Sequence, residues 1–222
     1  MGAADFIITV TDRKEHRDFA EWFRRRDIPL VLSTYGRGTA TTEVLDYLGL
    51  EDTEKVVLFF VAPHSPKMIR QAAKDLWLDV PGRGILMTIP ITSIGGQTAM
   101  DYLIRGEAEE SVEKELTHEL IIAITNQGYT DKVMDAARSA GAGGGTAIHA
   151  KGTGAELARK FFGVSIASEK EIVFILTPVE TKKAIMKAIM AEAGMQTKAQ
   201  SLVFSLPVSD LAGLRQLSID DK

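Results

Sequence analysis

An internal duplication limits the possible folds of this chain more than any other feature of its sequence. Residues 5–11 (DFIITVT) match residues 119–125 (ELIIAIT), and residues 37–39 (RGT) fall on residues 151–153 (KGT) at the same offset, without a gap. After a small drift of that offset, two further pairs of segments match: 57–63 with 172–178, and 86–91 with 203–208. The chain therefore encodes one structural unit twice, and a fold assigned to one half has to suit the other.

Each copy shows the hydrophobic periodicity of four strands and two helices. In the first copy, short runs rich in β-branched and aromatic residues predict strands at residues 5–11, 30–35, 56–62 and 85–89. Apolar residues at helical spacing predict helices over residues 14–26 and 66–77, and the second copy repeats both, with Gly194 as the C-cap of its last helix. The order βαββαβ, read twice, predicts an α+β chain of tandem ferredoxin-like domains, with antiparallel sheets and helices on one face. We expect a first domain at 1–104, a charged linker at about 105–117 and a second domain at 118–222.

The predicted strands are apolar at nearly every position, so the sheet face without helices also needs a cover, and we expect self-association to provide it.

Composition and charge exclude several classes of partner. A net charge of -4 without a basic cluster argues against nucleic acid as a partner. The sequence has no cysteine, no leader-like N-terminus and no apolar run long enough for a membrane span. These features indicate a cytoplasmic protein without direct membrane insertion.

Three features of the first copy stand out: Gly36-Arg37-Gly38 at the end of the second strand, Gly82-Arg83-Gly84 before the fourth strand, and the strand-plus-proline segment 85–91. Together they resemble the P-II signal-transduction family, also called the nitrogen regulatory protein P-II family. The second copy resembles a diverged P-II domain through residues 147–154 and 202–208. The resemblance covers nearly all of each copy.

The resemblance implies a regulatory protein and not an enzyme. It would bind a small molecule, such as ATP, ADP or another adenine nucleotide, in clefts between subunits, and it would regulate a partner enzyme or membrane transporter in nitrogen metabolism or transport. The homo-oligomer would be a trimer of two-domain chains. Glycine backbones and arginine side chains suit phosphate oxygens, and the ligand-binding residues that the resemblance implies are Gly36, Arg37, Gly38, Thr39, Gly82, Arg83, Gly84, Lys151, Gly152 and Thr153.

The sequence also departs from the family pattern. Ile85 and Leu202 stand where P-II proteins have a phosphate-binding lysine, and basic residues beyond the last strand are missing. Residues 41–49 and 155–163 predict short amphipathic helices instead of a long signalling loop, so we do not carry over binding of 2-oxoglutarate with a metal. The four histidines are scattered, and no metal site is predicted.

Two other functions stay open at this point. The chain could be an oligomeric scaffold or interaction protein whose ligand sites have degenerated. An acyl-phosphate hydrolase of ferredoxin-like fold is the third possibility. That activity needs a positioned Arg and Asn on the first loop and second strand, and the only nearby candidate, Asn126, has no evident arginine partner. The sequence also leaves two assemblies open, which are stacked trimeric rings and an intrachain pseudo-dimer.

Overall fold

The described residues form two compact units. The computed structural model describes residues 4–26, 28, 31–39, 54–91, 101, 116–151 and 169–214. Unit 1 consists of Met1–Tyr35, Thr41–Leu116 and Pro207–Lys222. Unit 2 consists of Gly36–Ala40 and Thr117–Leu206. Each unit therefore includes a segment from the other half of the sequence.

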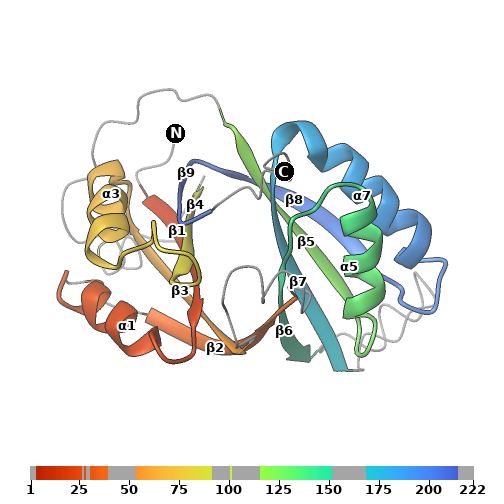
Figure 1. The fold of residues 1–222 in the computed structure, drawn as a ribbon, viewed down its shortest axis with the longest axis horizontal. Helices are drawn as coiled ribbons and strands as arrows, with labels where there is room; N and C mark the ends of the chain where they lie inside the picture. The colour runs from red at the N-terminus through yellow and green to blue at the C-terminus, as the bar shows by residue number, and fades with distance from the viewer. Residues whose placement is uncertain are drawn as a thin grey trace, which may run out of the picture. The chain divides into compact units, whose positions relative to one another are not determined.

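Unit 1 is an antiparallel sheet with two helices on one face (Figure 1). The order of its strands is β2-β3-β1-β4-β9. Its elements are β1 (Ala4–Asp12), α1 (His16–Arg24), β2 (Val31–Gly38), β3 (Glu54–Pro63), α3 (Pro66–Asp75), β4 (Gly84–Pro90) and β9 (Asp210–Ala212). Strand β9 comes from the end of the chain and pairs with β4, with Asp210 opposite Thr88.

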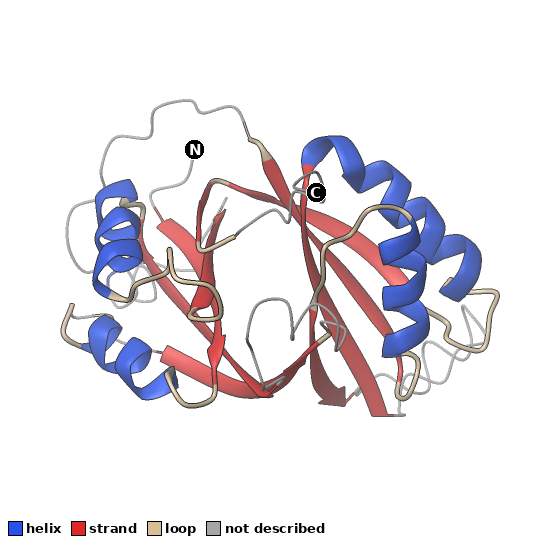
Figure 2. Ribbon diagram, in the orientation of Figure 1, coloured by secondary structure: helices blue, strands red, loops and turns tan. Residues whose placement is uncertain are grey.

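Unit 2 repeats this arrangement, with helices on one face of an antiparallel sheet (Figure 2). The strand order is β8-β5-β7-β6, and the last residues of β2 pair with β6. Its elements are β5 (His118–Asn126), α5 (Thr130–Ser139), β6 (Thr146–Lys151), β7 (Glu169–Pro178), α7 (Val179–Ala193) and β8 (Leu202–Val208). The predicted fold class is thus confirmed, since the order βαββαβ occurs twice.

The two helix-side cores use different side chains at equivalent positions. In unit 1 the face of α1 buries Phe19, Trp22 and Phe23 against Phe60 and other strand residues. In unit 2 the face of α5 buries mainly small residues and one methionine, namely Val133, Met134, Ala136 and Ala137. Small residues on a helix allow it to lie close to the sheet, whereas aromatic residues hold it further away and fill the space between.

Local sequence explains several of the element boundaries. Helix α3 starts at Pro66, where a missing N–H costs nothing, and the Ser65 hydroxyl accepts from the Met68 N–H at 3.1 Å as an N-cap. Helix α7 ends at Ala193 with Gly194 as its C-cap, as the sequence predicts. In the described part of the chain, no helix is long and apolar enough to cross a membrane. Self-association through the helix-free sheet faces stays a prediction.

Candidate functional site

The predicted segment 36–39 ends strand β2 and is part of unit 2. Its residues 36–38 pair with β6, Gly36 opposite Ile148, so this backbone is used in the sheet. A Cβ atom on Gly36 would lie 3.1 Å from the carbonyl oxygen of Ala147 and 3.1 Å from Cγ2 of Ile148. Close approach of two strands, and not a positive φ, is therefore what requires glycine at this position.

Thr39 and Arg37 already have partners within unit 2. The Thr39 N–H and hydroxyl both donate to the Gly145 carbonyl at 2.9 Å, and the Gly145 N–H donates to the Thr39 hydroxyl at 2.8 Å. Arg138 donates to the Thr39 carbonyl. The Arg37 guanidinium lies 3.4 Å from the Asp131 carboxylate. A ligand at this segment would have to replace these contacts.

The predicted turn at Gly82–Gly84 lies in unit 1 and needs both of its glycines. Gly82 has φ of 83° and Gly84 has φ of 154°. A Cβ atom on Gly84 would lie 2.7 Å from the Val10 carbonyl oxygen, and a Cβ atom on Gly213 would lie 2.1 Å from the Gly84 carbonyl oxygen. The turn is therefore packed between β1 on one side and the C-terminal segment on the other.

Arg83, the charged residue of this turn, also has protein partners. Its guanidinium forms an ion pair with Glu15, and its carbonyl accepts a hydrogen bond from the Thr11 hydroxyl at 2.9 Å. This ion pair is partly exposed, so a phosphate group could compete with the carboxylate of Glu15 at low cost.

The remaining predicted residues belong to the end of β6 and the segment after it. Lys151 is the last residue of β6 and pairs through its backbone with Glu169. Gly152 and Thr153 lie outside the described residues, as do the predicted helices at 41–49 and 155–163. The described candidates are thus divided between the units: residues 36–39 and Lys151 in unit 2, and residues 82–84 in unit 1.

Lys170, in unit 2, is the only buried lysine among the described residues. Lys170 is only 6% exposed and lies on β7, directly between Asn126 on β5 and Ala150 on β6. Its ammonium donates to the Asn126 Oδ1 atom. Burial lowers the pKa of this ammonium below the ordinary lysine value. In the described part of the chain, no carboxylate forms an ion pair with Lys170.

The duplication allows a comparison of this lysine with its equivalent in unit 1, where the partner on the neighbouring strand is a carboxylate. At the equivalent place Lys55 lies opposite Asp12, and its ammonium is 3.5 Å from the Asp12 carboxylate. In unit 2 the acid has become the neutral amide of Asn126 while the lysine is kept. A buried cation without a counter-charge is costly, and a bound anion would remove that cost.

The surroundings of Asn126 hold its amide in place for this contact. The Asn126 Nδ2 atom donates to the Lys198 carbonyl at 2.9 Å and lies 3.4 Å from the Gln200 Oε1 atom. Gln200 has φ of 48°, which is unusual for a residue other than glycine. Backbone strain of this kind concentrates at functional sites. These bonds direct the Asn126 oxygen, and not its nitrogen, toward Lys170.

A second buried charge lies on the helix side of the same strand. Glu171 is 8% exposed and accepts from the Thr130 hydroxyl at 2.7 Å and the Gly128 N–H at 3.1 Å. The His149 Nδ1 atom lies 3.9 Å from its carboxylate. These contacts join the start of α5 to β7 and β6. Among the described residues, no group of three potential ligands could hold a metal.

Sequence reasoning did not single out Lys170. One lysine before an apolar strand is common, and nothing local distinguishes it from Lys55. The available signal was the difference between the copies, because the repeat aligns Asp12 with Asn126 in the strand that pairs with each lysine.

The model of the family Nitrogen regulatory protein P-II matches residues 118–217. The second half of the chain is P-II-like. The sequence-based recognition is therefore confirmed, and the matched region contains Asn126, Lys170 and Glu171. The family consists of regulatory signal-transduction proteins, and this is the functional class that the match indicates. No curated protein matches the chain.

Solved structures similar to this chain include P-II of Arabidopsis thaliana bound to citrate, at 19% identity and a TM-score of 0.33, covering 43% of this chain and 79% of that chain. A functionally unknown protein from Pediococcus pentosaceus is similar at 17% identity and a TM-score of 0.30, over 43% of this chain and 96% of that one. An unknown protein from Galdieria sulphuraria covers 92% of this chain and 98% of its own, at 11% identity and a TM-score of 0.29.

Proposed function

We propose that this chain is a P-II-like regulatory protein whose second unit senses a small anion at Lys170. One observation carries the proposal: in a domain that matches the P-II family model, the buried Lys170 ammonium has a neutral amide as its partner where the other copy has a carboxylate. An anionic ligand would supply the missing charge beside a lysine that is 6% exposed.

Adenine nucleotides are the first ligands to test. A phosphate oxygen is a strong acceptor for an ammonium group, and the resemblance to the P-II family independently implies ATP or ADP. We also propose assembly into a trimer of two-domain chains and control of a partner enzyme or transporter by the ligand. The glycine turn at residues 82–84 is proposed as a separate phosphate-binding place within unit 1, open to a ligand only if it displaces Glu15 from Arg83.

Thermal shift with ATP, ADP, AMP and citrate, followed by calorimetry, tests the sensing step. A ligand at 100 times its Kd should stabilise the folded chain by about 2.7 kcal/mol. Lys170→Gln removes the ammonium and should abolish the shift. Lys55→Gln is the matched control, because it removes the equivalent lysine whose partner is a carboxylate, and it should keep the shift.

Asn126→Asp is the sharper variant, since it gives Lys170 the counter-charge found in unit 1. The side chain keeps its size, so the fold should persist, as far-UV circular dichroism can check. The added carboxylate should neutralise the Lys170 ammonium and repel the anionic ligand, and so weaken anion binding at least tenfold. Equal binding by Asn126→Asp and the parent protein would contradict the proposal.

The scaffold function is the alternative, and it is favoured by the protein partners that Arg37 and Arg83 already have. It predicts that none of the ligands shifts the melting temperature, while light scattering still shows an oligomer. A monomeric mass would contradict the proposed trimer.

A further inference from the structure

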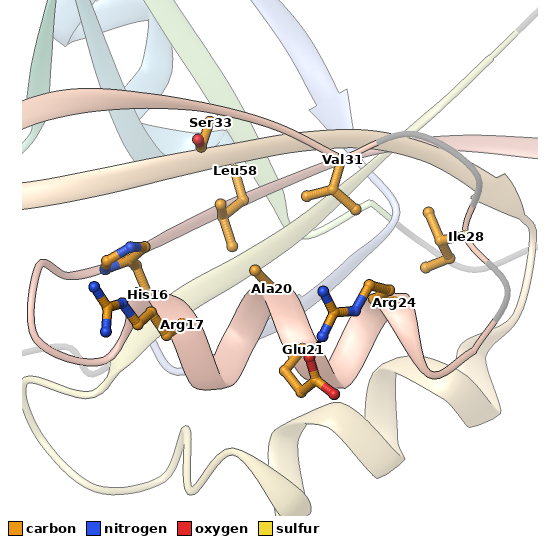
Figure 3. Close-up of a pocket in the computed structure, with 9 residues that line it drawn as sticks. All are labelled: His16, Arg17, Ala20, Glu21, Arg24, Ile28, Val31, Ser33 and Leu58. Carbon is orange, nitrogen blue, oxygen red and sulfur yellow. Dashed lines mark ion pairs between the residues drawn. The ribbon is translucent and has the colours of Figure 1, made fainter.

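A cavity in unit 1 lies between helix α1 and strands β2 and β3, away from the residues discussed above. Its volume is about 540 Å³, which is within the usual range for small-molecule sites. The floor is mainly apolar, with Ala20 from α1, Val31 from β2, Leu58 from β3, and Ile28, and it has one hydroxyl, that of Ser33 on β2. Figure 3 shows Ala20 pointing from the helix toward Leu58 and Val31 on the strands.

The rim of the cavity is cationic. Arg17 and Arg24 line it together with His16 and one acid, Glu21. The Glu21 carboxylate already forms two ion pairs, one with Arg24 and one with Arg25, whose Nε atom lies 3.0 Å from the other carboxylate oxygen. The Arg17 side chain forms no hydrogen bond or ion pair within the part of the chain that the structure describes. The site therefore offers an apolar floor beside an uncompensated guanidinium.

The other copy shows that this cavity is not a requirement of the fold. At the position equivalent to Ala20, unit 2 has Met134, which is fully buried. A Cβ atom on Gly145, which stands at the place of Val31, would lie 3.1 Å from the Met134 sulfur. The same alignment puts Asp131 at the place of Arg17. One copy thus fills the space and reverses the rim charge.

We propose that the cavity between α1 and β2 binds a small amphipathic anion, namely a free carboxylate with a medium-length hydrocarbon chain. The hydrocarbon chain would lie over Ala20 and Val31, which are half-buried, with the buried Leu58 and Ile28 behind them, and removal of the ligand's own chain from water would supply most of the affinity. The carboxylate would accept charge-assisted hydrogen bonds from Arg17 at the rim. A compact polyanion suits the site poorly, because Ala20, Ile28, Val31 and Leu58 have no donor side chain and the Ser33 hydroxyl is the one side-chain donor of the floor.

Titration calorimetry with octanoate as the probe tests this assignment. The parent protein should bind octanoate with one site per chain, and it should bind both octanol and acetate at least tenfold more weakly. Ala20→Met, the residue found in the other copy, should fill the cavity and weaken octanoate at least tenfold without loss of folding. Arg17→Asp, also taken from the other copy, should weaken octanoate but leave octanol unchanged.

Arg25→Gln is the control, since this residue is on the same helix and contacts Glu21 but does not line the cavity. It should bind octanoate within twofold of the parent. Equal octanoate binding by Ala20→Met, or equal affinity for octanoate and octanol, would overturn the proposal. So would binding only to vesicles of an anionic phospholipid, which would identify a membrane surface and not a free carboxylate as the ligand.

Discussion

Gly84→Ala should destabilise unit 1 severely, although it adds a single methyl group. An alanine at φ of 154° is strained by roughly 1–3 kcal/mol. The new Cβ atom would lie 2.7 Å from the Val10 carbonyl oxygen and 3.3 Å from the Phe19 ring, and β1 cannot retreat because it pairs with β3 as well as β4. Displacing one of these pairings would cost about 1 kcal/mol for each hydrogen bond lost. We expect a total loss of about 2–4 kcal/mol in the free energy of unfolding.

Urea unfolding followed by tryptophan fluorescence measures this loss in one unit. Both tryptophans of the chain, Trp22 and Trp77, are in unit 1, so their emission reports that unit alone. Gly143→Ala is the control for an added methyl group, because Gly143 has neither a positive φ nor any atom within 4 Å of the added Cβ. Since Gly143 is in unit 2, its unfolding is followed by far-UV circular dichroism, and its stability should change by less than about 0.5 kcal/mol. A loss below about 1 kcal/mol in Gly84→Ala would refute the steric reasoning.

Three further predictions concern buried groups. Burial raises the pKa of the Asp5 carboxyl above 3.8, so the stability that protonated Asp5 contributes is complete below pH 3.8 and is lost as the pH rises through the folded-state pKa. Asp5→Asn keeps a polar partner for His64 and should flatten the dependence of the free energy of unfolding on pH above pH 4, as urea unfolding can measure. An unchanged slope would contradict this origin of the pH dependence. Thr39→Val leaves the Gly145 N–H without its acceptor and should cost about 1–3 kcal/mol, with faster hydrogen exchange at that amide; retained protection would argue against the contact. Met134→Ala should open a cavity in unit 2 and cost about 2–5 kcal/mol in urea unfolding followed by far-UV circular dichroism, unless α5 collapses onto the sheet.

Local patterns predicted most of the fold, because strand and helix periodicity are properties of short segments. The predicted helix at 14–26 contains α1, and the predicted strand at 30–35 overlaps β2, which continues to Gly38. The three-residue strand β9 was missed, since Asp210–Ala212 has no strand pattern of its own and becomes a strand only by pairing with β4. Such pairing depends on residues far apart in the sequence, and a window along the chain does not contain it.

The candidate site was harder to predict than the fold for a related reason. The glycines at 36 and 84 could be read as turn residues, but each is required by a backbone from a distant segment, β6 for Gly36 and β1 for Gly84. For Lys170, the decisive fact is that a lysine with 6% exposure has an amide as its partner, and this exposure is set by the whole unit. The nucleotide contacts, the domain limits at 104 and 118, and the trimer stay predictions.

The pairing of β9 with β4 also bears on how the chain folds during its synthesis. Thr88 binds the Asp210 N–H through its hydroxyl, a contact between residues separated by 122 positions. At about 5–20 residues per second, the ribosome needs roughly 6–24 s to add that length of chain. The edge of β4 in unit 1 therefore lacks its β9 partner until residues 210–212 have been synthesised. A chaperone or an early folding contact that shields this edge would protect the nascent chain from aggregation.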